Sequence, residues 1–285
     1  MKPATLISLE DLSYWRSDKR HEAQTVAFVP TMGALHQGHL TLVKQAKEYA
    51  DKVIVSIFVN PKQFGPNEDF AKYPRTIDAD LKKLASLGVD AVFLPNAADI
   101  YPEDFQTKIH NEKMSQMLCG ASRPGHFDGV LTIVMKLFNL VQPEYVLFGK
   151  KDYQQVKIIE QMVKDYSMNI KIITAETVRD DDGLALSSRN KFLSETERHV
   201  ATLIFKALQK AKQVYESGSR SKLQLEETFV KVFSESSELV LEYFEVRKQK
   251  SLEEIEFDEL AEPMVLLVAA RLGTTRLIDN IELGG

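Results

Sequence analysis

Short apolar runs alternate with amphipathic helical patterns through the first two thirds of the chain, and this alternation limits the possible folds more than any other feature. Residues 53–59 are almost continuously apolar, as expected of a parallel strand that is buried on both faces. Strand–helix–strand repeats with short links form right-handed units in an open, doubly wound parallel sheet. We therefore predict an α/β fold. The predicted strands are residues 25–29, 53–59, 91–94, 145–148 and 170–175, and the predicted helices are residues 40–49, 78–87, 128–141 and 153–166.

The pattern changes after about residue 176. Ser194 and Glu197 form a capping box, which predicts the start of a long amphipathic helix that ends near residue 216. A second helix follows, to about residue 233. The strand-like segments after it are residues 240–246, 264–270 and 276–281. This order predicts a smaller α+β domain.

A chain of 285 residues suits one large or two modest domains. We predict two, over residues 1–176 and 177–285, with the second attached through the polar stretch 179–183. The hydrophobic content of 44% and the charged content of 27% are typical of a globular protein. The net charge of −5, with basic residues spread along the chain, argues against a nucleic-acid partner.

Other classes are disfavoured by what the chain lacks. No apolar stretch approaches the roughly 20 residues that span a bilayer, so no membrane partner is expected. The first residues contain no apolar core of a signal peptide, and the single cysteine, Cys119, excludes an intrachain disulfide. These features favour a cytoplasmic location.

The run from Pro30 to His39 follows a predicted strand and opens a predicted helix. A turn that contains glycine at such a place favours an anion, because the first helical N–H groups have no helical partner and the helix dipole attracts negative charge. His36 and His39, spaced i, i+3, lie on the same side of the helix start. An ordinary turn with two solvated histidines would show the same pattern. Zinc is disfavoured, because no cysteine or acidic residue lies at a suitable spacing.

Two further polar turns follow predicted strands, at residues 60–63 and 149–152, and the carboxyl ends of parallel strands meet at one edge of a sheet. A lysine at such a turn neutralises phosphate as a point charge. Asp152 would cap the next helix, hold a lysine or approach a metal. Residues 186–190 carry hydroxyls and a guanidinium that suit phosphate oxygens. Residues 149–152 alone are equally consistent with a solvated turn. Residues 186–190 alone would more often be an ordinary loop, and Gln63 alone would be an ordinary surface amide.

Two other segments are rich in turn residues. For residues 123–129 we favour a structural loop with Asp128 as a helix cap, and the alternative is that Arg123 or His126 lines the cleft. Residues 63–75 contain glycine and proline and little apolar periodicity, which predicts a mobile flap over a site. The alternative is an ordinary surface connection.

Taken together, these motifs closely resemble the pantothenate synthetases, also called pantoate–β-alanine ligases. The matching segments are residues 30–39, 58–64, 73–75, 123–127, 149–155, 186–190 and 277–280, in the family's order along nearly the whole chain. Each motif is weak alone, but their combination in register is very specific. Class I aminoacyl-tRNA synthetases and nucleotidylyltransferases are wider relatives, with a similar His-x-Gly-His turn.

The resemblance implies an ATP-dependent condensation of pantoate with β-alanine, through a pantoyl adenylate, with release of AMP and pyrophosphate. It further implies Mg²⁺, a homodimer, and a Rossmann-like domain with a smaller C-terminal domain that covers the active site. The residues that would contact ATP are Met32, Gly33, Ala34, Leu35, His36, Gln37, Gly38, His39, Gly149, Lys150, Lys151, Asp152, Val178, Leu186, Ser187, Ser188 and Arg189. The candidate catalytic residues among them are His36, His39, Lys151, Ser187, Ser188 and Arg189. Gln63 and Gln155 would contact pantoate, with Gln63 near β-alanine, and no metal ligand is assigned.

Two other functions remain open at this point. A nucleotidylyltransferase would transfer a nucleotide and stop there, and a nucleotide-sensing module would bind ATP without turnover. A tRNA synthetase is disfavoured, because the acidic chain has no room for a sizeable anticodon-binding domain.

Overall fold

The computed structural model describes residues 2–18, 23–66, 68–255 and 262–284, and its internal contacts divide the chain into two units. The first unit comprises Met1–Lys150 and Gln155–Glu176, and the second comprises Lys151–Gln154 and Thr177–Gly285. The short segment Lys151–Gln154 therefore packs with the second unit, although it lies between two segments of the first unit in the sequence.

A six-stranded sheet forms the centre of the first unit, with the strand order β1-β4-β3-β2-β5-β6 and parallel pairing throughout. The strands are β1 (Ala4–Leu6), β2 (Val26–Thr31), β3 (Lys52–Ile57), β4 (Ala91–Phe93), β5 (Tyr145–Gly149) and β6 (Lys171–Ala175). The predicted parallel α/β fold is confirmed. The additional strand β1 was not predicted, because it has three residues and only Leu6 is buried.

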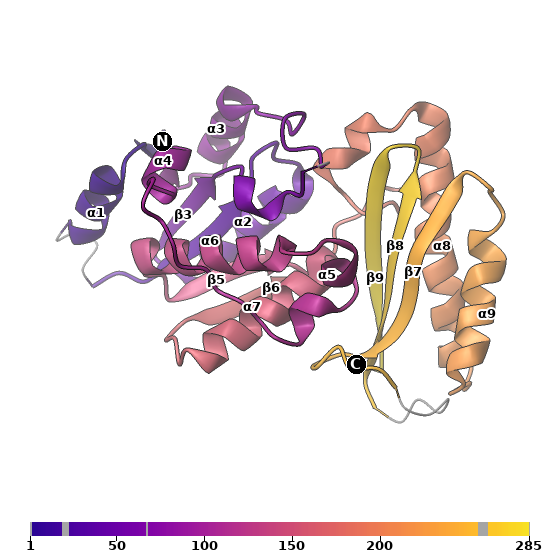
Figure 1. Cartoon of the computed structure of the whole chain (residues 1–285). Helices are drawn as coiled ribbons and strands as arrows, with labels where there is room; N and C mark the ends of the chain where they lie inside the picture. The colour runs from indigo at the N-terminus through magenta and orange to yellow at the C-terminus, as the bar shows by residue number, and fades with distance from the viewer. Residues whose placement is uncertain (1, 19–22, 67, 256–261, 285) are drawn as a thin grey trace. The chain divides into compact units, whose positions relative to one another are not determined.

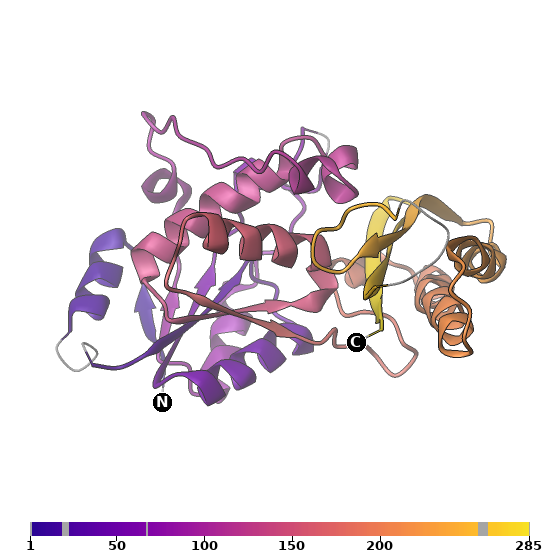
Figure 2. The same cartoon turned by 90° about the horizontal axis from the view of Figure 1, so that it is seen from below.

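Helices cover both faces of this sheet, with α2 on one face and α6 and α7 on the other (Figures 1 and 2). The helices of this part of the chain are α1 (Leu9–Ser17), α2 (Gln37–Tyr49), α3 (Ile77–Ser86), α4 (Ala97–Ile100), α5 (Cys119–Ser122), α6 (His126–Val141) and α7 (Tyr153–Asp165). The apolar face of α2, with Leu42, Val43 and Ala46, belongs to the same buried cluster as Val53 and Val55 of β3. Burial of such faces is the main force that holds a helix on a sheet.

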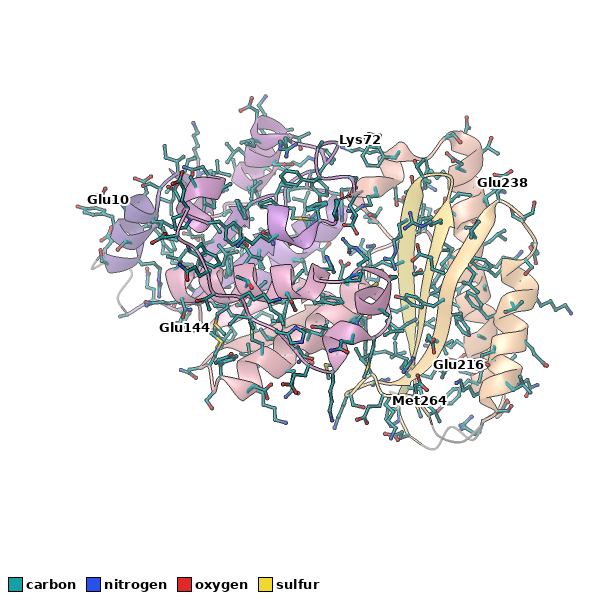
Figure 3. All side chains as sticks on the ribbon, in the orientation of Figure 1. Glu10, Lys72, Glu144, Glu216, Glu238 and Met264 are labelled. Carbon is teal, nitrogen blue, oxygen red and sulfur yellow. The ribbon has the colours of Figure 1, made fainter. Side chains whose placement is uncertain are left out.

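The direction of strand addition reverses between β2 and β5. From β2 the chain adds β3 and β4 on one side, whereas β5 and β6 extend the sheet on the other side. Glu144, labelled in Figure 3, accepts a hydrogen bond from the Val26 amide at 2.6 Å and ties the start of β2 to that of β5. Ligands of doubly wound sheets bind beyond the carboxyl ends of the strands at such a reversal. The turns that follow β2, β3 and β5 are therefore neighbours at one edge, as predicted.

The second unit contains an antiparallel sheet of β7 (Leu239–Lys248), β8 (Met264–Leu272) and β9 (Thr275–Leu283), together with α8 (Glu195–Glu216) and α9 (Lys222–Phe233). The predicted capping box opens α8: the Ser194 hydroxyl accepts from the Glu197 amide, and the Glu197 carboxylate accepts from the Ser194 amide. Ile204 of α8, Phe229 of α9 and Leu266 of β8 share one buried cluster. The α+β character of this unit agrees with the sequence.

The polar stretch 179–183 forms part of the second unit and not a simple linker. The Gly183 amide donates to the Asp180 carbonyl at 2.9 Å, and Gly183 has a φ of +90°, which favours glycine. Arg179 donates to both carboxylate oxygens of the buried Asp279, at 2.6 and 2.8 Å. These bonds fix the turn against β9. Among the described residues, no helix has the length and apolar character to cross a bilayer.

Candidate active site

The turn after β2 is held from α3 by a buried carboxylate. Asp80 is fully buried and accepts hydrogen bonds from the amides of Ala34 and Leu35, at 2.8 and 2.9 Å. The Thr76 hydroxyl donates to the same carboxylate at 3.0 Å, and the Lys83 ammonium donates to the Leu35 carbonyl. This carboxylate fixes a backbone that runs through positive φ at Gly33 and Ala34.

Sequence reasoning missed Asp80. The available signal was an acidic residue four positions after Thr76, on the face of α3 that also carries the buried Leu84. A buried carboxylate needs hydrogen-bond partners. An acidic residue on the apolar face of a helix therefore indicates that another segment donates hydrogen bonds to it.

Replacement of Asp80 by alanine is expected to destabilise the protein. Each buried amide that loses its acceptor costs about 1–3 kcal/mol, so we expect a loss of about 3 kcal/mol in the free energy of unfolding. Urea unfolding measures this loss. The matched control is Asp78→Ala, at an exposed position in the first turn of the same helix, with an expected loss below about 1 kcal/mol. Equal losses for the two variants would contradict the role of Asp80.

His36 and His39 come together at the start of α2, as predicted. Their ring centroids are 4.0 Å apart, and the His36 amide donates to Nδ1 of His39 at 3.3 Å. Because Nδ1 of His39 accepts a hydrogen bond, the neutral ring carries its proton on Nε2. His39 can therefore donate a hydrogen bond from Nε2.

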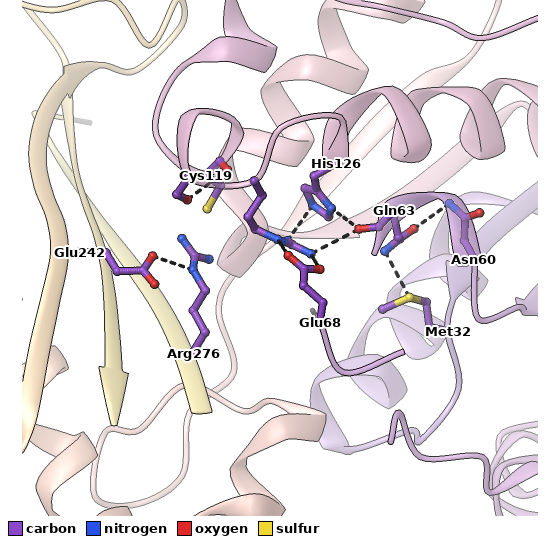
Figure 4. A network of polar contacts seen from close by, with 10 residues as sticks. Met32, Asn60, Gln63, Glu68, Cys119, His126, Glu242 and Arg276 are labelled. Atoms are coloured by element: carbon purple, nitrogen blue, oxygen red, sulfur yellow. Dashed lines mark hydrogen bonds and ion pairs between the residues drawn. The ribbon is translucent and has the colours of Figure 1, made fainter. Parts of the chain in front are cut away.

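The turn after β3 orients the Gln63 amide. The buried Asn60 donates from Nδ2 to the Gln63 Oε1 at 3.0 Å, and Gln63 Nε2 contacts the Met32 sulfur at 3.2 Å (Figure 4). Asn60 is fixed in turn by the Gly129 carbonyl at 3.1 Å and by the Tyr101 hydroxyl at 2.8 Å. Burial raises the pKa of Tyr101 well above its usual range, so its hydroxyl stays a donor. Asn60 lies within the predicted polar turn 60–63, but the sequence does not indicate its central position in this network.

The residues of the turn after β5 belong to different units. Gly149 ends β5, and the Lys150 ammonium forms an ion pair with Glu176 in the first unit. Lys151 belongs to the second unit, where Asn280 Nδ2 donates to its carbonyl at 2.9 Å, and its ammonium lies 3.9 Å from Asp152. Asp152 thus lies near a lysine, which was one of its predicted roles. Gln155, in the first turn of α7, is half-buried in the first unit.

The remaining predicted nucleotide residues lie together in the second unit. The Leu186 amide donates to the Val178 carbonyl at 3.0 Å, and Arg179 forms an antiparallel bridge with Ala185. The Ser187 hydroxyl caps the short helix that includes Ser188 and Arg189, by accepting from the Arg189 amide at 3.3 Å. The structure therefore joins Val178, which lies in none of the matching motifs, with the motif residues 186–189.

The prediction that Asp128 caps α6 is wrong. The capping position is Gly125, with a φ of +81°, where glycine is favoured over residues with a side chain. Asp128 lies in the first turn and accepts hydrogen bonds from His110 at 2.7 Å and Lys108 at 2.9 Å. Burial opposes ionisation of Asp128, but these partners outweigh it and hold its pKa below the usual value.

Comparisons with known proteins agree along the chain. A family model described as pantoate-beta-alanine ligase matches residues 5–282. The pantothenate synthetase of Geobacter sulfurreducens is 44% identical over 97% of this chain and 97% of its own. The crystal structure of the pantothenate synthetase from Thermus thermophilus has a TM-score of 0.92 and 38% identity, and 98% of each chain is covered.

A second solved structure carries ligands. It is the pantoate-beta-alanine ligase of Francisella tularensis in complex with beta-gamma ATP and beta-alanine, with a TM-score of 0.79 and 37% identity. The match covers 98% of this chain and 97% of that chain. The similarity therefore includes both units.

Proposed function

The chain belongs to the pantoate–β-alanine ligase family, so it condenses pantoate with β-alanine at the expense of ATP, and we propose how its residues perform the reaction. One observation carries the assignment of residues. The histidine pair and the oriented Gln63 amide follow the adjacent parallel strands β2 and β3, beside the reversal point of the sheet.

In the first step the pantoate carboxylate attacks the α-phosphorus of ATP and forms a pantoyl adenylate with release of pyrophosphate. This attack needs no general base, because a carboxyl group with a pKa of about 4 is already ionised at pH 7. Gln63 and Gln155 hold pantoate. Their neutral amides orient its hydroxyls and carboxylate without weakening the nucleophile with a positive charge.

The phosphates are held by amides and cationic or polar side chains. Because Asp80 occupies the Ala34 and Leu35 amides, we assign anion binding at this turn to the first turn of α2, which begins at Gln37. His39 donates from Nε2 to a phosphate oxygen. Charge that develops in the transition state is stabilised by His36, His39, Lys151, Ser187, Ser188 and Arg189. The other ATP contacts are Met32, Gly33, Ala34, Leu35, Gln37, Gly38, Gly149, Lys150, Asp152, Val178 and Leu186.

In the second step β-alanine attacks the carbonyl carbon of the adenylate as its neutral amine, and AMP leaves. Gln63 lies near this amine in the proposed arrangement. Of the assigned residues, Gln63 and Gln155 belong to the first unit, whereas Lys151, Asp152, Val178 and residues 186–189 belong to the second.

Mg²⁺ belongs to the same proposal. Among the described residues, no group of three or more His, Cys, Asp or Glu side chains is arranged to hold a metal ion. Mg²⁺ commonly binds through substrate phosphates, water and one or two carboxylates. This mode of binding needs no cluster of protein ligands, so the described residues are compatible with a Mg²⁺ ion that arrives with ATP and would neutralise phosphate charge.

A homodimer and a cytoplasmic location complete the proposal. The family resemblance supports the homodimer. The requirement for ATP supports the location, and the presence of a single, buried cysteine agrees with it.

Product analysis tests the function. Incubation with ATP, Mg²⁺, pantoate and β-alanine should yield pantothenate and AMP, and omission of either organic substrate should abolish the amide. An adenylated product that β-alanine does not convert would identify a nucleotidylyltransferase. ATP binding without turnover would identify a sensor.

A further inference from the structure

We propose that Arg123 is a positioning residue that, together with Glu68 and His126, fixes the main chain at Gln63 and thereby orients the amide that holds pantoate. The inference rests on the proposed function for the link to pantoate, although the effect of Arg123 on Gln63 is a property of the unliganded protein. The sequence favours a structural loop for residues 123–129, with Arg123 or His126 in the cleft lining as the alternative. The structure connects both side chains to the main chain of Gln63.

The carbonyl oxygen of Gln63 is held by two groups. Arg123 Nη2 donates to it at 3.3 Å, and His126 Nδ1 lies 2.8 Å from it (Figure 4). A carbonyl oxygen only accepts hydrogen bonds, so Nδ1 of His126 carries a proton. Arg123 Nη1 lies 3.0 Å from Nε2 of His126, and a guanidinium only donates, so Nε2 accepts. Both contacts are satisfied by the same neutral tautomer of His126.

Glu68 sets the orientation of the guanidinium. Its carboxylate accepts from Arg123 Nε at 2.7 Å and from Nη2 at 2.6 Å, and the exposed fractions are 28% for the Glu68 side chain and 18% for Arg123. Burial alone would raise the pKa of Glu68, but the hydrogen bonds and charge of Arg123 outweigh it and lower the pKa. A planar guanidinium held at two nitrogens has little rotational freedom. The ion pair therefore directs Arg123 toward Gln63.

Gln63 is thus restrained at its main chain and at both ends of its amide. Asn60 holds Oε1, the Met32 sulfur contacts Nε2, and Arg123 with His126 holds the carbonyl. Loss of the carbonyl contacts would allow the turn to shift, and a shift of about 1 Å in a positioning group can lower the rate about 10²-fold. Because Glu68 occupies the guanidinium, Arg123 acts through Gln63 and not through a substrate carboxylate.

The first readout is kinetic. Arg123→Gln should lower kcat/KM for pantoate about 10²-fold, and Glu68→Gln about tenfold, with KM for ATP unchanged within about twofold. The double charge reversal Arg123→Glu with Glu68→Arg restores an ion pair but no donor at position 123, so it should not rescue the loss. The matched control is Lys108→Gln, which breaks an exposed ion pair to Asp128 on α6 and should leave pantoate kinetics unchanged.

Three kinetic results would overturn the inference. Rescue by the double reversal would show that the ion pair acts only through general stability. A lower KM for either carboxylate substrate in Glu68→Gln would show that Arg123 binds substrate directly. An equal loss in Lys108→Gln would remove the specificity of the effect.

The second readout needs no substrate. The ¹³C-methyl signal of Met32, assigned by comparison with Met32→Leu, reports the contact between its sulfur and Gln63. This signal should move in Arg123→Gln and stay in place in Lys108→Gln, and an unchanged signal in Arg123→Gln would overturn the inference. A moved signal with normal pantoate kinetics would instead overturn the assignment of pantoate to Gln63 in the proposed function. Urea unfolding of each variant verifies that it is folded.

Discussion

Replacement of His39 or Lys151 by alanine is expected to lower kcat by about 10²- to 10³-fold, with a much smaller effect on ATP affinity. The reason is that a preorganised donor acts most strongly on charge that develops in the transition state. The His36 amide holds Nδ1 of His39, which leaves the proton on Nε2, and Asn280 anchors the main chain of Lys151. The His39 ring is therefore oriented before the substrate binds, and the main chain that carries Lys151 is fixed.

Turnover is measured by pyrophosphate release at saturating substrates, and ATP affinity by calorimetry. The matched controls are His199→Ala on α8 and Lys164→Ala on α7, which are exposed and lie outside the candidate site. Both should retain normal turnover. Equal losses of turnover and affinity in His39→Ala or Lys151→Ala, or near-normal turnover, would contradict the assignment.

The second large effect is expected for Gly129→Ala. Glycine to alanine inside a helix usually stabilises it by about 1 kcal/mol. At Gly129 of α6, however, an added Cβ would lie 2.1 Å from the Lys62 carbonyl oxygen and 2.7 Å from the Gln63 amide nitrogen. The turn that carries Gln63 would have to move. We expect a destabilisation of about 3 kcal/mol and a loss of about 10²-fold or more in kcat/KM for pantoate.

Urea unfolding and initial rates at varied pantoate measure these effects. Gly65→Ala is the control, because the nearest atom to an added Cβ there is Glu68 Cγ at 3.6 Å, an ordinary contact. Its stability and kinetics should stay close to those of the parent. If Gly129→Ala were as stable and active as the parent, the close packing of α6 against this turn would not matter for the site.

The sequence predicted the fold where side-chain patterns are long. Buried parallel strands such as β3 are continuously apolar, and the apolar positions of the amphipathic helices repeat over several turns. The pattern of apolar residues in the sequence therefore predicts both kinds of element directly. Helix ends were less predictable. The predicted start of α2 at residue 40 was three residues late, because His36 caps the helix and its first residues are polar. The cap of α6 is a glycine at positive φ, and Asp128 was the more usual choice.

The sequence predicted the motifs of the candidate site, but not the residues that hold these motifs in place by hydrogen bonds. His36 and His39 meet because a helix places residues i and i+3 on one side, which local geometry dictates. Asp80, Asn60 and Glu68 instead bond to residues that lie 46, 69 and 55 positions away in the sequence. Contacts of this kind depend on how strands and loops pack, so a local pattern can mark a buried polar residue such as Asp80 but does not identify its partners.

Pyrophosphate exchange tests whether the reaction proceeds in the proposed order. If pantoate is activated before β-alanine binds, the enzyme must reverse the first step with pantoate alone. The adenylate and pyrophosphate then re-form ATP without any amine.

The most direct measurement is therefore the incorporation of radiolabelled pyrophosphate into ATP. The reaction contains the enzyme, Mg²⁺, ATP and pantoate, and parallel reactions replace pantoate by β-alanine or omit both. The account predicts exchange with pantoate alone and none with β-alanine alone. Exchange that requires β-alanine would contradict the formation of a pantoyl adenylate as the first step.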